Sequence, residues 1–551
     1  MPGYLGNNVD IFQFQNLLWQ PLYWFGKGLD QGINYGLSVG KPPVFSNGGR
    51  TVTVTLNRDY RWSDGQPVTN RDVEFWMNIF SAEKTNYYAY FDGSLPDDIT
   101  SMSFPATNPY QFSLTFNKAY SHLWVLYNQL SEIWPIPQQA WDKTSANGPI
   151  GNYDKTTAGA QAVYAFLNSQ ATDESTYTGA LWRTVDGPWV VQAFSPATGA
   201  ATFVPNRQYS GPGKPHLAAF EEVPFTTDAA EYDALRSGAL DYGYLPTQDI
   251  SQESYFTSRG YKVAPWIDFG FNSFWLNFTS PSVGAIFKQL YVRQALQELI
   301  DQPQIVKDIY RGQAYPDYGP VPAKPANPYT ATIGTDNPYP YSVATAKKTL
   351  RSHGWTVHPD GVDVCSKSGS AAGECGSGIG RGAQLKFSEL VATGSAPFTA
   401  EVEAIQSSWS EAGIQVTLRS EPETQIFATM EPCSDGNVGC NWEIGNFGAP
   451  GSTPTYSPEY LPLGTQWFAA GGGTNAGGYD SPKMNAIIAN ATTDSAVSAI
   501  RAFGVYAAQD LPNLWIPNYP YQLSVVSPKL KGALPQDPNL NIYPQNWVLE
   551  S

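Results

Sequence analysis

The sequence has little charge, only four histidines, and no apolar run long enough to cross a bilayer. A spanning helix needs about 20 apolar residues in succession, so we expect no membrane-spanning segment. Only 15% of the 551 residues are charged, and the formal net charge is −16. Affinity for nucleic acid depends mainly on Lys and Arg that neutralise phosphates, so we expect no nucleic-acid partner. The same shortage of basic residues argues against a polybasic patch for anionic membranes.

Motifs for catalysis are also scarce. The four histidines are scattered and form no H-E-x-x-H motif: they are His122, His216, His353 and His358. No G-x-S-x-G elbow occurs, and Gly376–Gly380 lacks the Lys and Ser/Thr of a phosphate-binding loop. The adjacent acid pairs Asp97-Asp98 and Glu221-Glu222 cannot face one gap as a glycosidase pair does. We therefore expect no catalytic residue, metal or cofactor, and a hydrolase is only a remote alternative.

The four cysteines fall into two close pairs. Cys365 and Cys375 flank a Gly/Ser-rich loop, and Cys433 and Cys440 flank another. A disulfide over so short a loop stabilises by roughly 2.5–3 kcal/mol in the chain-entropy model. Free thiols are an alternative, and so is zinc, although neither spacing is C-x2-C. Two disulfides would indicate an oxidising compartment.

The N-terminal residues MPGYLGNNVDIF do not read as a signal peptide, because no basic start precedes an apolar core. Taken with the expected disulfides, this predicts an extracytoplasmic protein, at the cell surface or in a periplasm, whose signal or lipoprotein segment has been removed. Aromatic residues make up 14% of the chain, which also holds 50 Gly and 44 Pro. This composition suits a loop-rich α/β protein with an aromatic-lined site, although core packing explains most aromatics.

The most informative stretch is residues 60–80, YRWSDGQPVTNRDVEFWMNIF. The preceding run, Thr51 to Leu56, alternates polar and apolar residues as a half-buried strand does. Ser63-Asp64-Gly65 predicts a turn. Thr69 reads as a helix N-cap, with Asp72 three residues later as in a capping box. The residues that follow at helical spacing on one face are Val73, Trp76 and Phe80.

This run resembles the Trp-Ser-Asp-Gly signature of the family 5 extracellular solute-binding proteins, which serve dipeptide, oligopeptide and nickel ABC importers. Six further stretches resemble the family in the family's own order. The further stretches include VDGPWVVQAF, YVRQALQELID and GGYDSPKM, and the wording of the first and last of these is similar to actinobacterial members. The seven stretches are residues 17–25, 60–80, 185–215, 291–325, 341–355, 401–418 and 475–490.

The resemblance implies an α/β, two-lobed periplasmic-binding-protein-like fold (type II), in its large form with an inserted subdomain. Residues 1–45 would open lobe I, and 46–184 would be its inserted subdomain. A second lobe I segment would follow at 185–265. Lobe II would occupy 266–514, and 515–551 would return to lobe I. The implied function is capture of a solute, a di- or oligopeptide, by hinge closure, and delivery by a monomer to ABC permease subunits.

Matched positions also imply ligand-binding residues. In peptide-binding relatives, an Asp shortly after a Gly-Trp pair anchors the ligand's amino group. Here Asn446 takes the Trp position and Ala449 lies near the Asp position. A free amine would then need another carboxylate, such as Glu443 or Glu459, and an oligosaccharide held on aromatic faces is the alternative ligand. The expected contact residues are Asn7, Asn8, Val9, Tyr88, Tyr90, Phe91, Phe271, Trp275, Asn446, Phe447 and Gly448.

Overall fold

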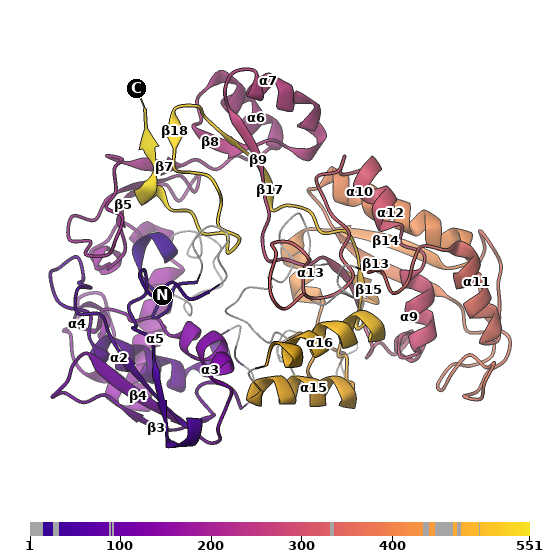
Figure 1. Cartoon of the computed structure of the whole chain (residues 1–551), viewed down its shortest axis with the longest axis horizontal. Coiled ribbons are helices and arrows are strands. Elements are labelled where there is room, and N and C mark those ends of the chain that lie inside the picture. Colours follow the sequence, from indigo (N-terminus) through magenta and orange to yellow (C-terminus); the bar gives the residue numbers. More distant parts are fainter. Residues whose placement is uncertain are drawn as a thin grey trace.

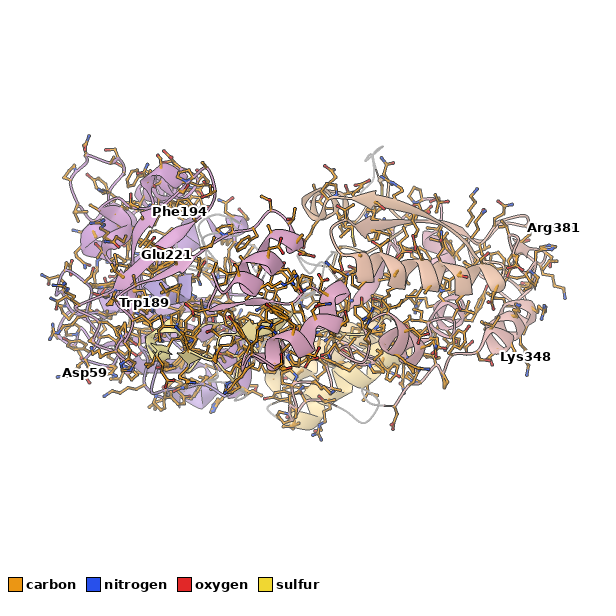
Figure 2. The ribbon with its side chains drawn as sticks, turned by 90° about the horizontal axis from the view of Figure 1, so that it is seen from above. Asp59, Trp189, Phe194, Glu221, Lys348 and Arg381 are labelled. Atoms are coloured by element: carbon orange, nitrogen blue, oxygen red, sulfur yellow. A yellow bond between two sulfur atoms is a disulfide. The ribbon has the colours of Figure 1, made fainter. Side chains whose placement is uncertain are left out.

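The protein forms two lobes side by side, with a smaller group of elements above and between them (Figure 1). This arrangement comes from a computed structural model of the 551-residue chain. Seen from above, the molecule is elongated, with Asp59 towards one end and Lys348 and Arg381 towards the other (Figure 2). The structure describes residues 15–25, 32–87, 90, 93–330, 336–433, 440–446, 467–470, 475–494 and 496–550.

The first lobe is built on an antiparallel four-stranded sheet in the order β1-β2-β4-β3. The predicted alternation holds in β2, where Val52 and Val54 are fully buried. In the helix that follows, the Thr69 side chain and Asp72 form the predicted capping box. The elements are β1 (Val44–Ser46), β2 (Thr51–Thr55), α2 (Asn70–Ala82), β3 (Ile99–Ser103) and β4 (Gln111–Phe116).

Further helices and a hairpin complete this lobe. Gly187-Pro188 leads into an antiparallel sheet in the order β5-β6-β7. The helices are α3 (His122–Asn128), α4 (Gln138–Trp141) and α5 (Thr157–Ala171). The strands are β5 (Trp189–Phe194), β6 (Ala201–Pro205) and β7 (Phe220–Glu222).

A small sheet joins distant parts of the chain. Its order is β8-β17-β9, so the central strand comes from nearly 300 residues further along than β8. Thr227 caps the helix that covers it, and Gly238 ends that helix in the left-handed conformation at φ 76°. The elements are α6 (Asp228–Ser237), β8 (Tyr242–Tyr244), α7 (Glu253–Thr257), β9 (Lys262–Trp266) and β17 (Gln522–Val526).

The second lobe contains a mixed five-stranded sheet in the order β14-β13-β15-β10-β16. Strands β13 and β14 are parallel, with Lys386 opposite Gln415, whereas β10 is antiparallel to both of its neighbours. The strands are β10 (Ser273–Leu276), β13 (Lys386–Ala392), β14 (Gln415–Glu421), β15 (Ile444–Gly445) and β16 (Asn513–Trp515). A separate two-stranded sheet in this lobe consists of β11 (Trp355–Thr356) and β12 (Val364–Cys365). The pair β18 (Leu530–Lys531) and β19 (Val548–Leu549) lies away from this lobe, with β18 beside β7 (Figure 1).

The second-lobe helices contribute buried apolar residues to the core of this lobe. The Asp301 side chain caps α10, where it accepts from the backbone N–H of Gln304. Helix α12 starts at Ala396, directly after its N-cap Ser395, so it begins before the family-like stretch at residues 401–418. The helices are α8 (Gly284–Phe287), α9 (Leu290–Gln297), α10 (Gln302–Asp308), α11 (Val343–Ser352), α12 (Ala396–Glu411), α13 (Glu423–Thr429), α15 (Pro482–Thr493) and α16 (Val497–Asp510).

Each lobe has its own apolar core. One buried cluster runs from Leu17 to Phe203 and the other from Phe269 to Tyr519. Both predicted disulfides are confirmed, with Cα–Cα distances of 6.1 Å for Cys365–Cys375 and 5.5 Å for Cys433–Cys440. Among the described helices, none combines the length and the apolar character needed to cross a bilayer.

Candidate functional site at the junction of the lobes

Two antiparallel segments connect the small sheet to the second lobe. Residues 267–272 lead from β9 to β10, and residues 516–521 lead back from β16 to β17. Backbone hydrogen bonds hold the two together: Tyr521 N–H donates to Trp266 O at 2.8 Å, and Ile516 N–H donates to Asn272 O at 3.3 Å. A pair of adjacent connections is the usual construction of a hinge between lobes.

A cavity of about 310 Å³ opens beside this hinge, between the small sheet and the start of α12. Four tyrosines lie in its wall: Tyr244, Tyr310, Tyr519 and Tyr521. Asp228 is the one ionisable carboxyl group in the lining, which includes no Lys, Arg or His among the described residues. The cavity therefore offers aromatic faces, hydroxyls and a negative charge.

Ring stacking and hydrogen bonds fix the positions of three of these tyrosines. Tyr310 and Tyr519 stack with ring centroids 5.0 Å apart. The Tyr310 hydroxyl donates to Glu401 Oε2 at 2.5 Å, and the Tyr244 hydroxyl donates to Asp228 Oδ1 at 2.9 Å. Glu401 lies on the buried face of α12 and is 0% exposed. One hydrogen bond thus links the cavity wall to a carboxyl group in the core of the second lobe.

Three buried carboxyl groups surround this wall. Burial raises the pKa of Glu401 to about 8, an effect that the hydrogen bond from Tyr310 opposes. Burial, with the charge of Glu401, raises the pKa of Glu389 on β13 to about 8. In the hinge, burial raises the pKa of Asp268 to about 7. A low-dielectric environment disfavours the ionised form of an acid, so the two glutamates are largely neutral at pH 7.

Most of the expected contact residues lie outside the described part of the chain: these are Asn7, Asn8, Val9, Tyr88, Phe91, Phe447 and Gly448. Tyr90 is described and lies in the first lobe, where its hydroxyl donates to Asp97 Oδ2 at 2.6 Å. Lys84 Nζ lies 4.9 Å from the centroid of the same ring. Tyr90 is not among the residues that line the cavity, and its contact with a ligand stays a prediction.

The other three expected residues are buried near the hinge. Phe271 and Trp275 belong to the second-lobe core, with exposed fractions of 0% and 1%. Asn446 Nδ2 donates to Asn272 Oδ1 and to Ser273 O, both at 2.9 Å. None of the three lines the cavity. Their roles in ligand binding stay predictions.

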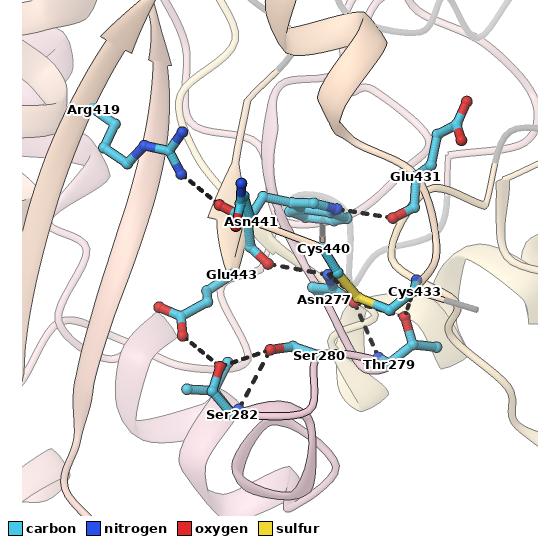
Figure 3. The surroundings of a disulfide bond; sticks show 12 residues. Asn277, Thr279, Ser280, Ser282, Arg419, Glu431, Cys433, Cys440, Asn441 and Glu443 are labelled. Atoms are coloured by element: carbon cyan, nitrogen blue, oxygen red, sulfur yellow. Dashed lines mark hydrogen bonds between the residues drawn. A yellow bond between two sulfur atoms is a disulfide. The ribbon is translucent and has the colours of Figure 1, made fainter. Parts of the chain in front are cut away.

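Glu443 and Glu459 are the two carboxylates suggested above as replacements for the missing Asp. Glu459 lies outside the described residues. Glu443 accepts hydrogen bonds from Ser282 Oγ at 2.7 Å and from Ser388 N–H at 2.6 Å, so it ties β13 to the chain after β10. Figure 3 shows Glu443 near the Cys433–Cys440 disulfide, whose Cys433 N–H donates to Thr279 Oγ1 at 2.8 Å. This carboxylate is already engaged in holding its own lobe together.

The sequence interpretation did not identify the cavity tyrosines, because they come from four separate segments. One local signal was available. Glu401 lies in the apolar stripe of its helix, between Phe398 and Val402, both buried. A charged residue on a core-facing stripe is expensive to bury, so it marks a position with a special role. Among the described residues, no cluster of three or more His, Cys, Asp or Glu is arranged to hold a metal ion.

Comparison with known proteins identifies the family. The family model for bacterial extracellular solute-binding proteins, family 5 (middle region), matches residues 41–460. The chain belongs to family 5 of the bacterial extracellular solute-binding proteins. The family-5 signature at residues 60–80 lies inside this match, as do the cavity residues from Asp228 to Pro397.

Curated relatives of this family-5 chain match over about half of its length. Protein XP55 of Streptomyces lividans is 24% identical over 327 residues, covering 58% of this chain and 50% of the relative. Oligopeptide-binding protein OppA of Bacillus subtilis is 23% identical over 297 residues, covering 50% of this chain and 47% of the relative. The chain thus spans about half the length of the curated relatives it matches.

A solved structure shows that the family-5 fold extends over the whole chain. The oligopeptide-binding protein AppA of Bacillus subtilis, solved in complex with a nonapeptide, superposes with a TM-score of 0.72. The alignment covers 100% of this chain and 96% of AppA at 16% sequence identity. The predicted two-lobed α/β fold is confirmed by this similarity.

Proposed function

We propose that this chain is the substrate-binding protein of an ABC importer, and that it captures peptides outside the cytoplasmic membrane and delivers them to the permease. The observation that carries the proposal is a family-5 match across most of the chain, together with two adjacent crossings at residues 267–272 and 516–521. Peptide is favoured as ligand because OppA and AppA, which this chain resembles, are oligopeptide-binding proteins.

The proposed mechanism is closure of the two lobes around the ligand. Closure at a hinge requires only rotations in the crossing segments, and a ligand shifts the balance by its differential affinity for the closed form. The division of the chain at residues 266 and 515 is part of this proposal. Both positions adjoin the crossing segments, which supports it. Delivery requires no covalent chemistry, so we propose a binding protein and not an enzyme.

The experiment is native mass spectrometry of protein purified under mild conditions from cells that synthesise it. Peptides that dissociate on activation, and that sequence as fragments of cellular protein, are the expected result. An oligosaccharide released in their place would overturn the peptide proposal. The same spectra report the oligomeric state, for which a monomer is expected. An N-terminus trimmed of an export segment in protein from the native host is the expected result for localisation.

A further inference from the structure

The cavity beside the hinge has chemistry that selects among ligands. Its lining combines four tyrosines with a single carboxylate, Asp228, and includes no basic side chain among the described residues. Asp228 accepts hydrogen bonds from Tyr244 and, at 3.1 Å, from Gln248 Nε2, but has no ion-pair partner in the described part of the chain. Aromatic faces with nearby carboxylates are a suitable environment for a cation.

Polar atoms without partners lie behind the wall. Glu401 is 0% exposed and Glu389 is 1% exposed. Neither oxygen of Glu389 has a hydrogen-bond partner among the described residues, and the same is true of Glu401 Oε1. Neither glutamate is among the residues that line the cavity, so both can act on a bound group only through their charge.

An anion is a poor candidate for that partner, although α12 points its N-terminus at the cavity. Three of the four amides at the start of α12 are unavailable: Pro397 has no N–H, Phe398 donates to Ser395 Oγ, and Thr399 donates to Ser395 O. Anion binding at a helix N-terminus depends on free amides, and here only that of Ala396 is left. The carboxyl groups therefore make the cavity more suitable for a positively charged group than for an anion.

We infer that this cavity is a subsite for a cationic group of the ligand, an ammonium or a guanidinium, held on the tyrosine rings with Asp228 and Glu401 as its counter-charges. The inference rests on the proposed function for the rest of the ligand. A cation beside Tyr310 favours the ionised form of Glu401, and through it of Glu389. Other carboxyl groups also act on the wall tyrosines. Asp268 in the hinge and Glu423 on α13 influence Tyr519, Asp268 and Glu222 influence Tyr521, and Glu231 influences Tyr244. Entry of the cation is therefore accompanied by release of a proton.

The test uses matched peptides and calorimetry at pH 7. Five pentaalanine peptides, each with one Arg at a different position, are compared with the same five carrying citrulline, the neutral isostere of Arg. At least one Arg peptide is expected to bind about tenfold more tightly than its citrulline partner. In Glu401→Gln and Asp228→Asn this preference falls to below about threefold. Argininamide alone is titrated as a probe that does not depend on peptide binding.

The controls separate loss of charge from loss of fold. Because Glu401 is largely neutral, Gln imitates its shape and still accepts from Tyr310, so the Tm at pH 7 is expected to stay unchanged. Glu298→Gln is the matched control: Glu298 is also a glutamate with a raised pKa, about 7 because of burial, and an unpartnered oxygen, but it lies at the end of α9 away from the cavity. This variant retains the preference. Enthalpies in phosphate and Tris buffers differ for Arg peptides, and the difference disappears in Glu389→Gln/Glu401→Gln.

The outcomes distinguish this inference from the proposed function. Peptides that bind with no preference between Arg and citrulline overturn the cationic subsite and leave peptide capture intact. Argininamide binding that Glu401→Gln abolishes, without any peptide binding, supports the subsite and overturns peptide capture. A preference for Arg that survives in Glu401→Gln and Asp228→Asn places the cation elsewhere and overturns the inference.

Discussion

The backbone N–H of Ser121 in the first lobe donates to the carbonyl oxygen of Thr492 in the second, at 2.9 Å. Thr492 lies in the last turn of α15, where carbonyl groups have no partner within the helix. Ser121 is also the N-cap of α3, whose Leu123 and Tyr127 pack against the second-lobe core. The two lobes therefore meet at a point remote in sequence from the hinge segments.

Removing this contact is expected to favour the open form. Ser121 has φ −55°, which proline tolerates, so Ser121→Pro deletes the N–H donor without straining φ. A hydrogen bond contributes about 0.5–1.5 kcal/mol, which corresponds to a roughly two- to tenfold shift in the balance of the two forms. Small-angle scattering of ligand-free protein measures this as a larger radius of gyration. Ser121→Ala keeps the N–H and should scatter like the wild type; equal scattering by all three proteins would contradict the prediction.

Arg71 is expected to be essential for the stability of the first lobe. Its guanidinium binds Asp154 through two hydrogen bonds of 2.7 and 2.5 Å and lies 3.5 Å from Asp142, and both carboxylates have fully buried side chains. Burial would raise the pKa of Asp154, but hydrogen bonds from Arg71 and Asn78 hold it below its ordinary value. Arg71→Met leaves the two buried carboxylates without a counter-charge. It should therefore lower the free energy of unfolding, measured in urea titrations, by about 3 kcal/mol.

A matched surface arginine provides the comparison. Arg50 is exposed and donates to Asn117 O at 2.7 Å, so Arg50→Met should change the free energy of unfolding by less than about 0.5 kcal/mol. An equal decrease in the free energy of unfolding in the two variants would contradict the prediction that burial of the Arg71 cluster makes it more stabilising.

The stability of the protein is expected to fall as the pH rises from about 5 to about 8. The pKa values of Glu389 and Glu401 are raised by burial to about 8, so the folded state retains protons that the unfolded chain has already lost. Their contribution is complete below their ordinary pKa and disappears as the pH passes 8. Urea unfolding at several pH values measures the slope. The double variant Glu389→Gln/Glu401→Gln should give a shallower slope, and an unchanged slope would refute the assignment.

The two disulfides should differ in how readily they are reduced. Cys365 and Cys375 are both fully buried, whereas Cys433 and Cys440 are only partly buried. Mild dithiothreitol on folded protein should therefore open Cys433–Cys440 first, as followed by alkylation and peptide mass mapping. Replacing Cys365 and Cys375 with Ala should lower the free energy of unfolding by about 2.5 kcal/mol, because the unfolded loop regains its freedom. Reduction of Cys365–Cys375 first would contradict this order.

Elements with strong local signals were predicted well. The capping box of Thr69 and Asp72 starts α2 where the sequence predicts it, since it depends only on neighbours within a few residues. Helix α12 likewise begins at a local signal, the Ser395 cap, five residues before the family-like stretch that starts at Glu401. Local chemistry determines such boundaries more sharply than similarity does.

The candidate site was much less predictable. Tyr244 and Tyr519 line the same cavity because β8 pairs with β17, the strand that follows Tyr519. No pattern in the sequence near either residue predicts this pairing. Matched family positions led to Phe271 and Trp275, whose aromatic side chains are equally suited to a core and are buried in one. Glu401 was the accessible clue, because a carboxyl group interrupts its apolar stripe.

The small sheet has a consequence for biogenesis. Its middle strand, Gln522–Val526, separates β8 from β9 and hydrogen-bonds to both. Until residues 522–526 have emerged from the ribosome, β8 and β9 have no strand between them to pair with. A chain synthesised from its N-terminus therefore completes this sheet only after the buried residues of both lobe cores have been made.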